Sequence, residues 1–422
     1  MDINTAMIEP VSSPKPVTAP VLSILTVTTL FPNPVQKTHG VFVETRLRKL
    51  LASGGVAARV LAPIPWLPSF ISYSTLGPLH QVPSRVIRDG LTIDHPRYLV
   101  VPKIGMSLTP HTLYRAMRKS LKRILHSGFR VDLIDAHYFY PDGVAAVWLA
   151  QEFNLPVTIT ARGTDLNLIP QYSRPRRLIQ QAAANADGLI TVCKALKDSL
   201  IELGVPDEKV LVLRNGVDLQ RFRPGDREQA RSEFDLTRPT LASVGHLVER
   251  KGHHHVIRAL AQLPGMDLLI AGAGPERQAL ESLATQLGVN QRVRFLGAVD
   301  QARLCRIYNA VDALVLASSR EGWANVLLEA MACGTPVVAS AVWGTPEVVA
   351  EPEAGVLMPS QDDAGVVAGV KALFANLPQR TATRAYAEGF DWEPTTQGQL
   401  TLFREILARR GAKGPQSAGQ SR

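Results

Sequence analysis

The 422-residue sequence is short of cysteine and has no long apolar run. Its three cysteines, Cys193, Cys305 and Cys333, stand singly and without metal-ligand spacing, which is typical of reduced core residues in the cytoplasm. No apolar stretch approaches the roughly 18 residues that span a bilayer. Residues 1–20 lack the basic and apolar segments of a signal peptide and predict a disordered tail, as do the polar residues 411–422. Cytoplasmic location is therefore the expectation.

Three sequence signatures of metal or cofactor binding are absent or incomplete. No Asp-x-Asp pair occurs that could hold a metal-bound diphosphate. The three consecutive histidines at 253–255 would point in different directions on a helix, so they predict no metal site. The glycines at 272 and 274 follow a strand-like run, but the third glycine of a dinucleotide fingerprint is absent. We therefore expect neither a metal nor another cofactor, and a Rossmann oxidoreductase is disfavoured.

The positive charge is concentrated in the first half of the chain. The first 221 residues carry 25 Lys and Arg against 16 Asp and Glu, whereas the rest carry 21 of each. The densest part is residues 111–130, where an apolar helical face is surrounded by five basic residues. Such a helix either lies on an anionic membrane surface or packs on a sheet with its charges in water. Nucleic acid is disfavoured, because no recognisable nucleic-acid motif and no interleaved aromatic residues occur there.

Strand-like apolar runs alternate with helical patterns in two series. The first series lies at 22–30, 58–64, 131–137, 156–160, 188–193 and 209–216, and the second at 240–245, 266–274, 293–297, 312–317 and 337–340. Alternation of this kind predicts parallel sheets covered by helices on both faces. The polar stretch 219–239 between the two series is the expected interdomain crossing. The sequence thus predicts two α/β domains, with a ligand in the cleft between them.

Two glutamates eight residues apart, Glu321 and Glu329, flank a short helical pattern in the second series. Asn325 is a candidate N-cap for this helix, and the glycine at 334 ends it. Gly322 favours a loop position for Glu321, whereas Glu329 is expected one or two turns into the helix. Loops after parallel strands line the ligand crevice, so both acids are candidates for ligand contact, and the alternative is that both are solvated helix residues.

A basic loop in the same domain is suited to phosphate. Residues 245–252 (GHLVERKG) follow a strand-like run and bring cations to the edge of the cleft. Together with a helix amino terminus at 323–326 they could hold a diphosphate, because backbone N–H groups and the helix dipole favour negative charge. Lys251 is a point charge suited to this contact. The alternative is a solvated turn, which a basic loop on its own more often forms.

The segment EGWANVLLE at 321–329 resembles the paired-glutamate signature of retaining glycosyltransferases of family 4, which have the GT-B fold. Further short motifs match in order along nearly the whole chain. They are GVFV at 40–43, DAH at 135–137, PDG at 141–143, RNGVD at 214–218, GHLVERKG at 245–252, GAGPE at 272–276 and FLG at 295–297. The resemblance implies two Rossmann-like domains whose parallel sheets face each other across a cleft. The expected acceptor-side domain is 21–218, with a helix at about 388–410 packing back on it, and the nucleotide-sugar domain is 219–387.

The resemblance also implies roles for individual residues. Glu329 would accept hydrogen bonds from ribose hydroxyls, Glu321 would hold hydroxyls of the donor sugar, and Lys251 matches the phosphate lysine. Backbone near Ala324, Asn325 and Val326 would take the diphosphate. The remaining donor-binding expectations are main chain at Val299 for the base, close backbone approach at Gly40, and the loop residues Gly245 and His246.

Two positions depart from the family pattern. His246 stands where an arginine is common, and Arg250 is the candidate to supply that charge. Arg162 stands where many members have a histidine, and because arginine cannot act as a base, an electrostatic or donor-positioning role is expected. His137 is the other candidate catalytic residue, with a buried structural histidine as the alternative. The expected catalytic set is thus Glu321, Lys251, Arg250, Arg162 and His137.

The predicted function is transfer of a sugar, with retention, from a UDP- or GDP-sugar to a lipid-linked saccharide or to a cell-surface polysaccharide or lipopolysaccharide. Expected partners are the nucleotide sugar and a saccharide acceptor, with no nucleic acid. An anionic membrane surface could recruit the basic first half, which would place the protein on the inner face of the cytoplasmic membrane. The alternatives are a nucleotide-sugar epimerase or phosphorylase on the same fold, and a two-domain binding protein without catalysis.

Overall fold

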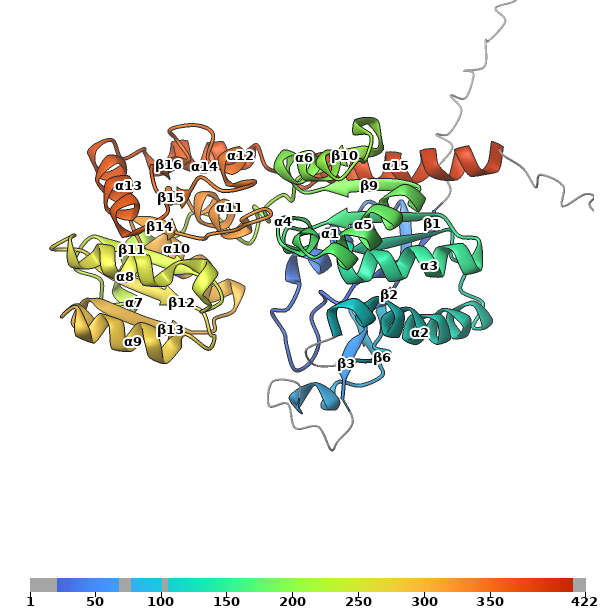
Figure 1. Ribbon diagram of the computed structural model, residues 1–422. Helices are drawn as coiled ribbons and strands as arrows, with labels where there is room; N and C mark the ends of the chain where they lie inside the picture. Colours follow the sequence, from blue (N-terminus) through green and yellow to red (C-terminus); the bar gives the residue numbers. More distant parts are fainter. Residues whose placement is uncertain (1–20, 68–76, 101–104, 413–422) are drawn as a thin grey trace, which may run out of the picture.

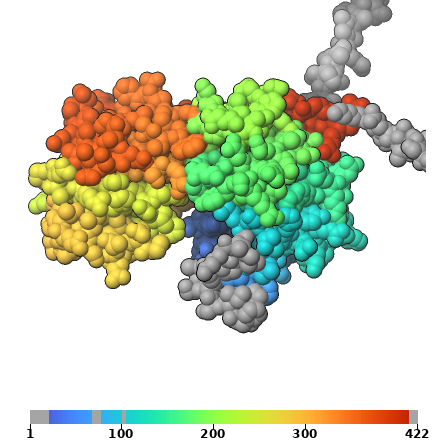
Figure 2. Space-filling model, in the orientation of Figure 1, coloured from blue at the N-terminus to red at the C-terminus, as the bar shows by residue number. Residues whose placement is uncertain are grey.

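The computed structural model describes residues 21–67, 77–100 and 105–412 and consists of two α/β domains side by side (Figure 1). Each domain is built on its own sheet, and nearly all strand pairs are parallel. In the space-filling view the domains touch along the upper part and are separated by a groove below (Figure 2). The predicted GT-B fold class is confirmed. Of the predicted disordered tails, 1–20 and 411–422, residues 1–20 and 413–422 lie outside the described residues. The prediction was wrong for residues 411 and 412, which belong to the last helix described.

The N-terminal domain contains an eight-stranded sheet in the order β10-β9-β8-β7-β1-β2-β5-β4. The β4–β5 pair is antiparallel, and the small β3–β6 pair stands apart from the main sheet. The strands of this domain are β1 (Leu22–Val27), β2 (Val56–Leu61), β3 (Ile64–Trp66), β4 (Arg85–Arg88), β5 (Leu91–Asp94), β6 (Arg97–Leu99), β7 (Leu133–His137), β8 (Val157–Ala161), β9 (Gly188–Thr191) and β10 (Val210–Val212).

The C-terminal domain contains a six-stranded parallel sheet in the order β13-β12-β11-β14-β15-β16. Its strands are almost continuously apolar because helices cover both faces. They are β11 (Thr240–Val244), β12 (Asp267–Ala271), β13 (Val293–Gly297), β14 (Ala313–Leu316), β15 (Val337–Ser340) and β16 (Gly355–Met358).

The helices follow the strands in the expected alternation. Those before the crossing are α1 (Val41–Ala52), α2 (Gly105–His126), α3 (Val144–Phe153), α4 (Thr164–Asn167), α5 (Ser173–Asn185) and α6 (Lys194–Glu202). Those after it are α7 (Arg227–Glu233), α8 (His253–Ala261), α9 (Arg277–Gln286), α10 (Gln301–Ala310), α11 (Asn325–Ala332), α12 (Thr345–Val348), α13 (Asp363–Ala375), α14 (Arg380–Glu388) and α15 (Glu393–Ala412).

The basic helix α2 buries its apolar face inside the N-terminal domain. Leu113, Met117, Leu121 and Ile124 are all fully buried, and the helix lies against α3. On its outer face, Arg118 forms an ion pair with Glu152 of α3. The apolar face is thus used within the fold, as in the sheet-packed interpretation of the sequence. None of the helices in the described ranges combines the length and low polarity needed to cross a bilayer.

The last helix, α15, returns to the N-terminal domain (Figure 1). Leu400, Phe403 and Ile406 are buried in the same apolar cluster as Ile24 of β1 and Leu47 of α1. The chain therefore crosses between the domains twice, once near 219–239 and once just before α15. The exact domain boundaries, at 218 and 387, stay predictions.

The sequence located the main strands but not every element. The edge strand β4, its neighbour β5 and the final strand β16 were not predicted, because they are only four residues long and their apolar residues are mixed with polar residues or glycine. The predicted N-cap at Asn325 was wrong. Ala324 occupies the cap position without a side-chain cap, and Asn325 is the first helical residue. Its side chain instead faces Asn215 of the other domain.

Candidate active site

A cavity of about 390 Å³ lies where the two domains meet. Its walls are loops that follow the carboxyl ends of parallel strands, the position at which open α/β sheets bind ligands. The N-terminal domain contributes Leu30, Phe42, Tyr138, Arg162, Gly163, Thr164, Asn167 and Asn215, and the C-terminal domain contributes Arg250, Lys251, Arg320, Glu321, Gly322, Trp323, Ala324, Asn325 and Val326.

Arg162 presents its guanidinium on the N-terminal wall, directly after β8. Its loop is fixed by the buried carboxylate of Asp165, which accepts hydrogen bonds from the backbone amides of Arg162 and Gly163. The guanidinium lies 5.6 Å from the ring centroid of Phe42 and donates to Asn215 Oδ1 at 3.1 Å. Burial lowers the pKa of Arg162 well below its ordinary value. Asp165 thus holds the backbone of this loop and does not bond to the guanidinium.

Lys251 and Glu321 form an ion pair on the C-terminal wall, with 2.5 Å between Nζ and Oε1. Both side chains are largely buried, with exposed fractions of 14% and 10%. Lys251 comes from the loop after β11, and Glu321 from the loop between β14 and α11. The prediction that Glu321 lies in a loop and Glu329 within the helix is confirmed.

The cavity has an excess of positive charge. Arg162, Arg250 and Arg320 line it together with the paired Lys251, and Glu321 is the only acid among the described lining residues. None of the three arginines forms an ion pair within the described part of the chain. The amino terminus of α11 opens on the same space through Ala324, Asn325 and Val326. A polyanion such as a diphosphate fits this combination of cations and a helix amino terminus.

Glu329 faces a second, smaller cavity of about 190 Å³, also formed by both domains. Phe42, Asn325 and Val326 line this cavity as well as the first, so the two adjoin. Tyr308 donates to Glu329 Oε2 at 3.2 Å. Burial raises the pKa of Glu329 to about 7, and the hydrogen bond from Tyr308 and the charge of Arg221 oppose that rise. A half-buried carboxyl group with one free oxygen can accept hydroxyl donors here.

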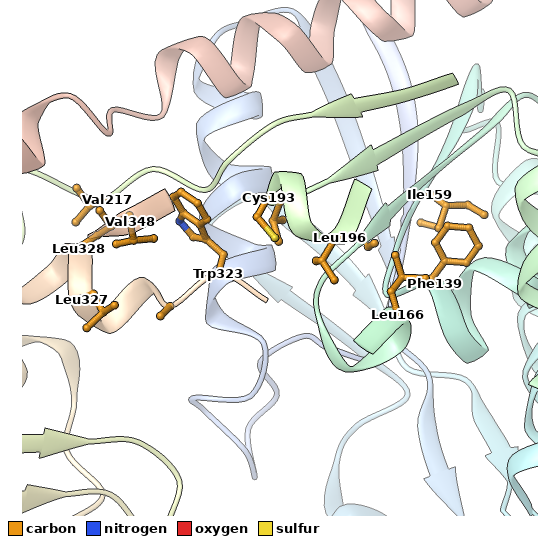
Figure 3. Close-up of a cluster of buried hydrophobic side chains, with 14 of the residues drawn as sticks. Phe139, Ile159, Leu166, Cys193, Leu196, Val217, Trp323, Leu327, Leu328 and Val348 are labelled. Carbon is orange, nitrogen blue, oxygen red and sulfur yellow. The ribbon is translucent and has the colours of Figure 1, made fainter. Parts of the chain in front are cut away.

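The walls of the larger cavity touch through glycine. A Cβ on Gly322 would lie 2.0 Å from the carbonyl oxygen of Arg162 and 2.8 Å from the Cα of Gly163, so no side chain fits between them. Next to this contact, Trp323 donates from Nε1 to the carbonyl of Asn215 at 3.0 Å. Figure 3 shows Trp323 between apolar side chains of the two domains, with Cys193 of the N-terminal domain on one side of it. The apolar core is therefore continuous across the domain contact.

A carboxylate from the C-terminal domain caps a helix of the N-terminal domain. Glu347 Oε1, on α12, accepts the backbone amide of Lys194 at 2.7 Å and that of Ala195 at 3.4 Å, at the start of α6. Its other oxygen pairs with Arg214 at 2.7 Å. The side chain thus supplies the acceptor that the first turn of α6 otherwise lacks.

Several predicted residues lie near the cavities without lining them. Gly40 is at the start of α1, and its close backbone approach is to Leu30, since a Cβ on Gly40 would lie 2.3 Å from that carbonyl group. Gly245 lies against the stem of Lys251, and the exposed His246 bonds to the carbonyl of Ala273. Val299 lies two residues before Gln301, which lines the smaller cavity. These placements put Arg250, not His246, at the cavity.

His137 lies behind Arg162 rather than at the cavity surface. Its exposed fraction is 1%, and both of its ring nitrogens are engaged, Nδ1 with Arg162 and Nε2 with Asp135. Burial lowers its pKa to about 4. This arrangement matches the structural alternative of the sequence analysis and leaves no nitrogen for a substrate.

Three residues of the site had no signal of their own in the sequence. Asn215 joins Arg162 to Asn325, Trp323 binds the carbonyl of Asn215, and Phe42 lies over the guanidinium. All three fall within short motifs that match the family, at 40–43, 214–218 and 321–329. The motifs therefore marked the segments, but not which side chain in each makes the contact.

Two family models cover the chain in succession. The model "Glycosyltransferase Family 4" matches residues 46–221, and the model "Glycosyl transferases group 1" matches residues 225–390. The junction between them falls at the polar crossing between the domains.

Relatives and solved structures agree with these models. The chain is 32% identical over 319 residues to the D-inositol 3-phosphate glycosyltransferase of Mycobacteroides abscessus, and the match covers 71% of both chains. Sucrose-phosphate synthase from Thermosynechococcus elongatus superimposes with a TM-score of 0.74 at 20% identity, over 92% of this chain and all of that one. Anabaena HepE in complex with UDP and glucose gives a TM-score of 0.69 at 20% identity, over 91% of this chain and all of that one.

Proposed function

This chain belongs to glycosyltransferase family 4, and from that premise we propose that it is a retaining enzyme that moves a hexosyl group from a UDP- or GDP-sugar to a saccharide acceptor carrying an anionic group. The observation that carries the proposal is the cavity between the domains, in which the Lys251–Glu321 pair faces Arg162.

The diphosphate would lie between Lys251, Arg250 and the amino terminus of α11. These groups are held in place before the reaction, so they can stabilise the charge that develops on the leaving diphosphate. Glu321 would then hold hydroxyls of the sugar, and Glu329, in the adjoining cavity, would accept the ribose hydroxyls. In the transfer the bond from the sugar to the phosphate breaks, the acceptor oxygen attacks from the same face, and its proton leaves with the diphosphate.

The excess of cations supports an acceptor with its own negative charge. A nucleoside diphosphate would meet Lys251, Arg250 and Arg162, whereas Arg320 adds further positive charge to the same cavity. The names of two proteins similar to this chain contain a phosphorylated sugar or polyol, inositol 3-phosphate and sucrose-phosphate. Lipid-linked and cell-surface saccharides with phosphate or carboxylate groups meet the same requirement. We also propose that the protein attaches to the inner face of the cytoplasmic membrane, where such acceptors would be available.

The test is a titration of the full chain with UDP, GDP and ADP and with their hexose conjugates, by calorimetry, on the wild type and on Glu329→Ala. One nucleotide is expected to bind selectively and to bind the variant more weakly. Absence of binding by every nucleotide to the folded protein would overturn the proposal and favour a binding protein of another kind. With donor and acceptor known, the anomeric coupling of the product by NMR tests retention.

A further inference from the structure

A chain of buried hydrogen bonds runs behind Arg162, away from the cavity. Arg162 Nη2 lies 2.5 Å from Nδ1 of His137, and Nε2 of His137 lies 3.0 Å from Oδ2 of Asp135. A guanidinium only donates, so Nδ1 must accept and the ring proton must be on Nε2, which donates to the carboxylate. The contact to Arg162 thus selects the neutral imidazole and one tautomer of it.

Asp135 is held in turn by α15, the last helix that the structure describes. Gln399 of α15 donates from Nε2 to Asp135 Oδ2 at 3.0 Å, and its Oε1 accepts from Nε of Arg46 at 2.8 Å. These two bonds fix the orientation of the Gln399 amide. Thr158 donates to the other oxygen of Asp135 at 3.1 Å. Gln399 and Asp135 are each 1% exposed, so water cannot replace a lost partner easily.

The other side of the Arg162 guanidinium leads into the C-terminal domain. Nη1 donates to Asn215 Oδ1 at 3.1 Å, and Asn215 Nδ2 donates to Oδ1 of Asn325, the first residue of α11, at 3.3 Å. Nε of Arg162 is buried and has no hydrogen-bond partner within the described structure. The guanidinium is therefore fixed by two neighbours, and because Nη1 and Nη2 each carry two hydrogens and make one of these bonds each, it retains donor capacity at the cavity that it lines.

We infer that Gln399, Asp135 and His137 are positioning residues that hold the Arg162 guanidinium on the cavity wall beside the amino terminus of α11, where the diphosphate would lie. Through Gln399 the C-terminal helix, 264 residues from Asp135 in sequence, takes part in anion binding without touching the substrate. The inference rests on the proposed function, because the effect is measured on binding of the nucleoside diphosphate.

Electrostatics favours the same interpretation. Arg46 and Arg162 bring two positive charges to this buried region, and Asp135 is the one acid among the described side chains bonded into their network. His137 must stay neutral, since an imidazolium would direct an N–H at the guanidinium. The low pKa of His137, about 4, keeps it neutral at physiological pH.

The experiment is a double-mutant cycle on the full chain, with UDP and GDP as calorimetric probes. Gln399→Leu is expected to weaken the binding of the preferred nucleotide about five- to tenfold in the wild-type background, and by less than twofold when Arg162 is already alanine. Leu400→Val, on the same helix and in the same core, is the matched control. It should lower the melting temperature but leave the affinity unchanged.

Equal weakening in both backgrounds, or no weakening in folded Gln399→Leu, would overturn the inference. If Gln399→Leu fails to fold, His137→Gln and His137→Leu replace it. A glutamine oxygen can accept from Arg162 and should keep affinity, whereas leucine should lose it. Equal affinities for these two variants would also overturn the inference. A wild type that binds neither nucleotide would instead refute the proposed function, so the two failures are distinguishable.

Discussion

Nζ of Lys251 and Oε1 of Glu321 lie 2.5 Å apart inside the cavity, so the cation expected to bind the phosphates is already paired with the acid expected to bind the sugar. If these roles hold, a donor would have to divide the pair. Its phosphates would compete with Glu321 for Lys251, and its sugar hydroxyls would replace Lys251 as donors to Glu321. One pre-formed contact would then bind both the phosphates and the sugar of the donor.

Substitutions of the two partners should affect ligands in opposite directions. Lys251→Ala should weaken UDP or GDP about 10- to 100-fold, since a hydrogen bond to a charged group contributes about 1.5–3 kcal/mol. Glu321→Gln should strengthen the free nucleoside diphosphate, because Lys251 is released, and should lower turnover of the sugar conjugate. Calorimetry and a turnover assay measure the two effects. The exposed Lys371→Ala is the control for loss of a positive charge.

The binding of the ribose should depend on pH through Glu329. Because the pKa of Glu329 is raised to about 7, the carboxyl gains its charge between pH 6 and pH 8, and the charged form accepts hydroxyl donors better. We expect nucleotide affinity to rise about tenfold over this range. In Glu329→Gln the rise should disappear, after the titration of the nucleotide phosphate, common to both proteins, is subtracted. Identical profiles for the two proteins would contradict the assignment.

The stability of the fold should respond to the same group with the opposite sign. Folding raises the pKa of the Glu329 carboxyl, so the protonated group does not oppose folding. As the pH rises from the ordinary pKa of a glutamate through about 7, the group loses its proton in the folded state and the free energy of unfolding falls. Glu329→Gln should therefore raise the melting temperature at pH 8 more than at pH 5. A larger gain at pH 5 would show that the group is not buried as described.

Glu347 should control how often the domains separate near α6. Glu347→Gln keeps the size of the side chain but removes the charge that binds Arg214 and the two amides. Exchange of the Lys194 and Ala195 amides with deuterium should become roughly 10- to 100-fold faster, from the loss of charge-assisted hydrogen bonds. Glu351→Gln, an exposed acid three residues beyond α12, is the control. Unchanged exchange in Glu347→Gln would show that this contact does not couple the domains.

Gly322→Ala should separate the walls of the cavity. The new methyl group would overlap the carbonyl oxygen of Arg162, and overpacking of this kind costs about 1–3 kcal/mol unless the structure moves. The fold of each domain should survive, the radius of gyration by small-angle scattering should rise, and kcat/KM should fall about 5- to 100-fold. Gly105→Ala is the control, since a Cβ there meets no neighbour nearer than 3.9 Å. A variant with unchanged scattering and turnover would show that the walls need not touch.

The fold class could be predicted from the sequence because the local patterns that indicate it recur along the chain. The apolar strand runs and the helical patterns between them indicate the α/β alternation directly. The paired glutamates lie in the loop and the helix that the motif predicts. The edge strands β4 and β16 are only four residues long and were not recognised from their sequence alone. Element boundaries depend on contacts that no window of sequence contains, as the misplaced cap at Asn325 shows.

The site could be predicted only in part, for the same physical reason. Lys251 and Glu321 are 70 residues apart, and their motifs suggested a shared ligand but not that they pair with each other. The partners of Glu347 and Gln399 are 153 and 264 residues away. Neither residue belongs to a local pattern, because what makes each important is the packing of two domains or of the last helix.

The position of α15 also bears on how the protein is made. Its buried side chains complete the core around β1 and α1, which leave the ribosome before α15 does. At about 5–20 residues per second, synthesis of the intervening chain takes on the order of 20–70 seconds, during which that apolar face has no covering helix. The N-terminal domain therefore cannot complete this part of its core until α15 has been translated, and a nascent chain interrupted before Gln399 would expose an apolar surface on which chaperones can act.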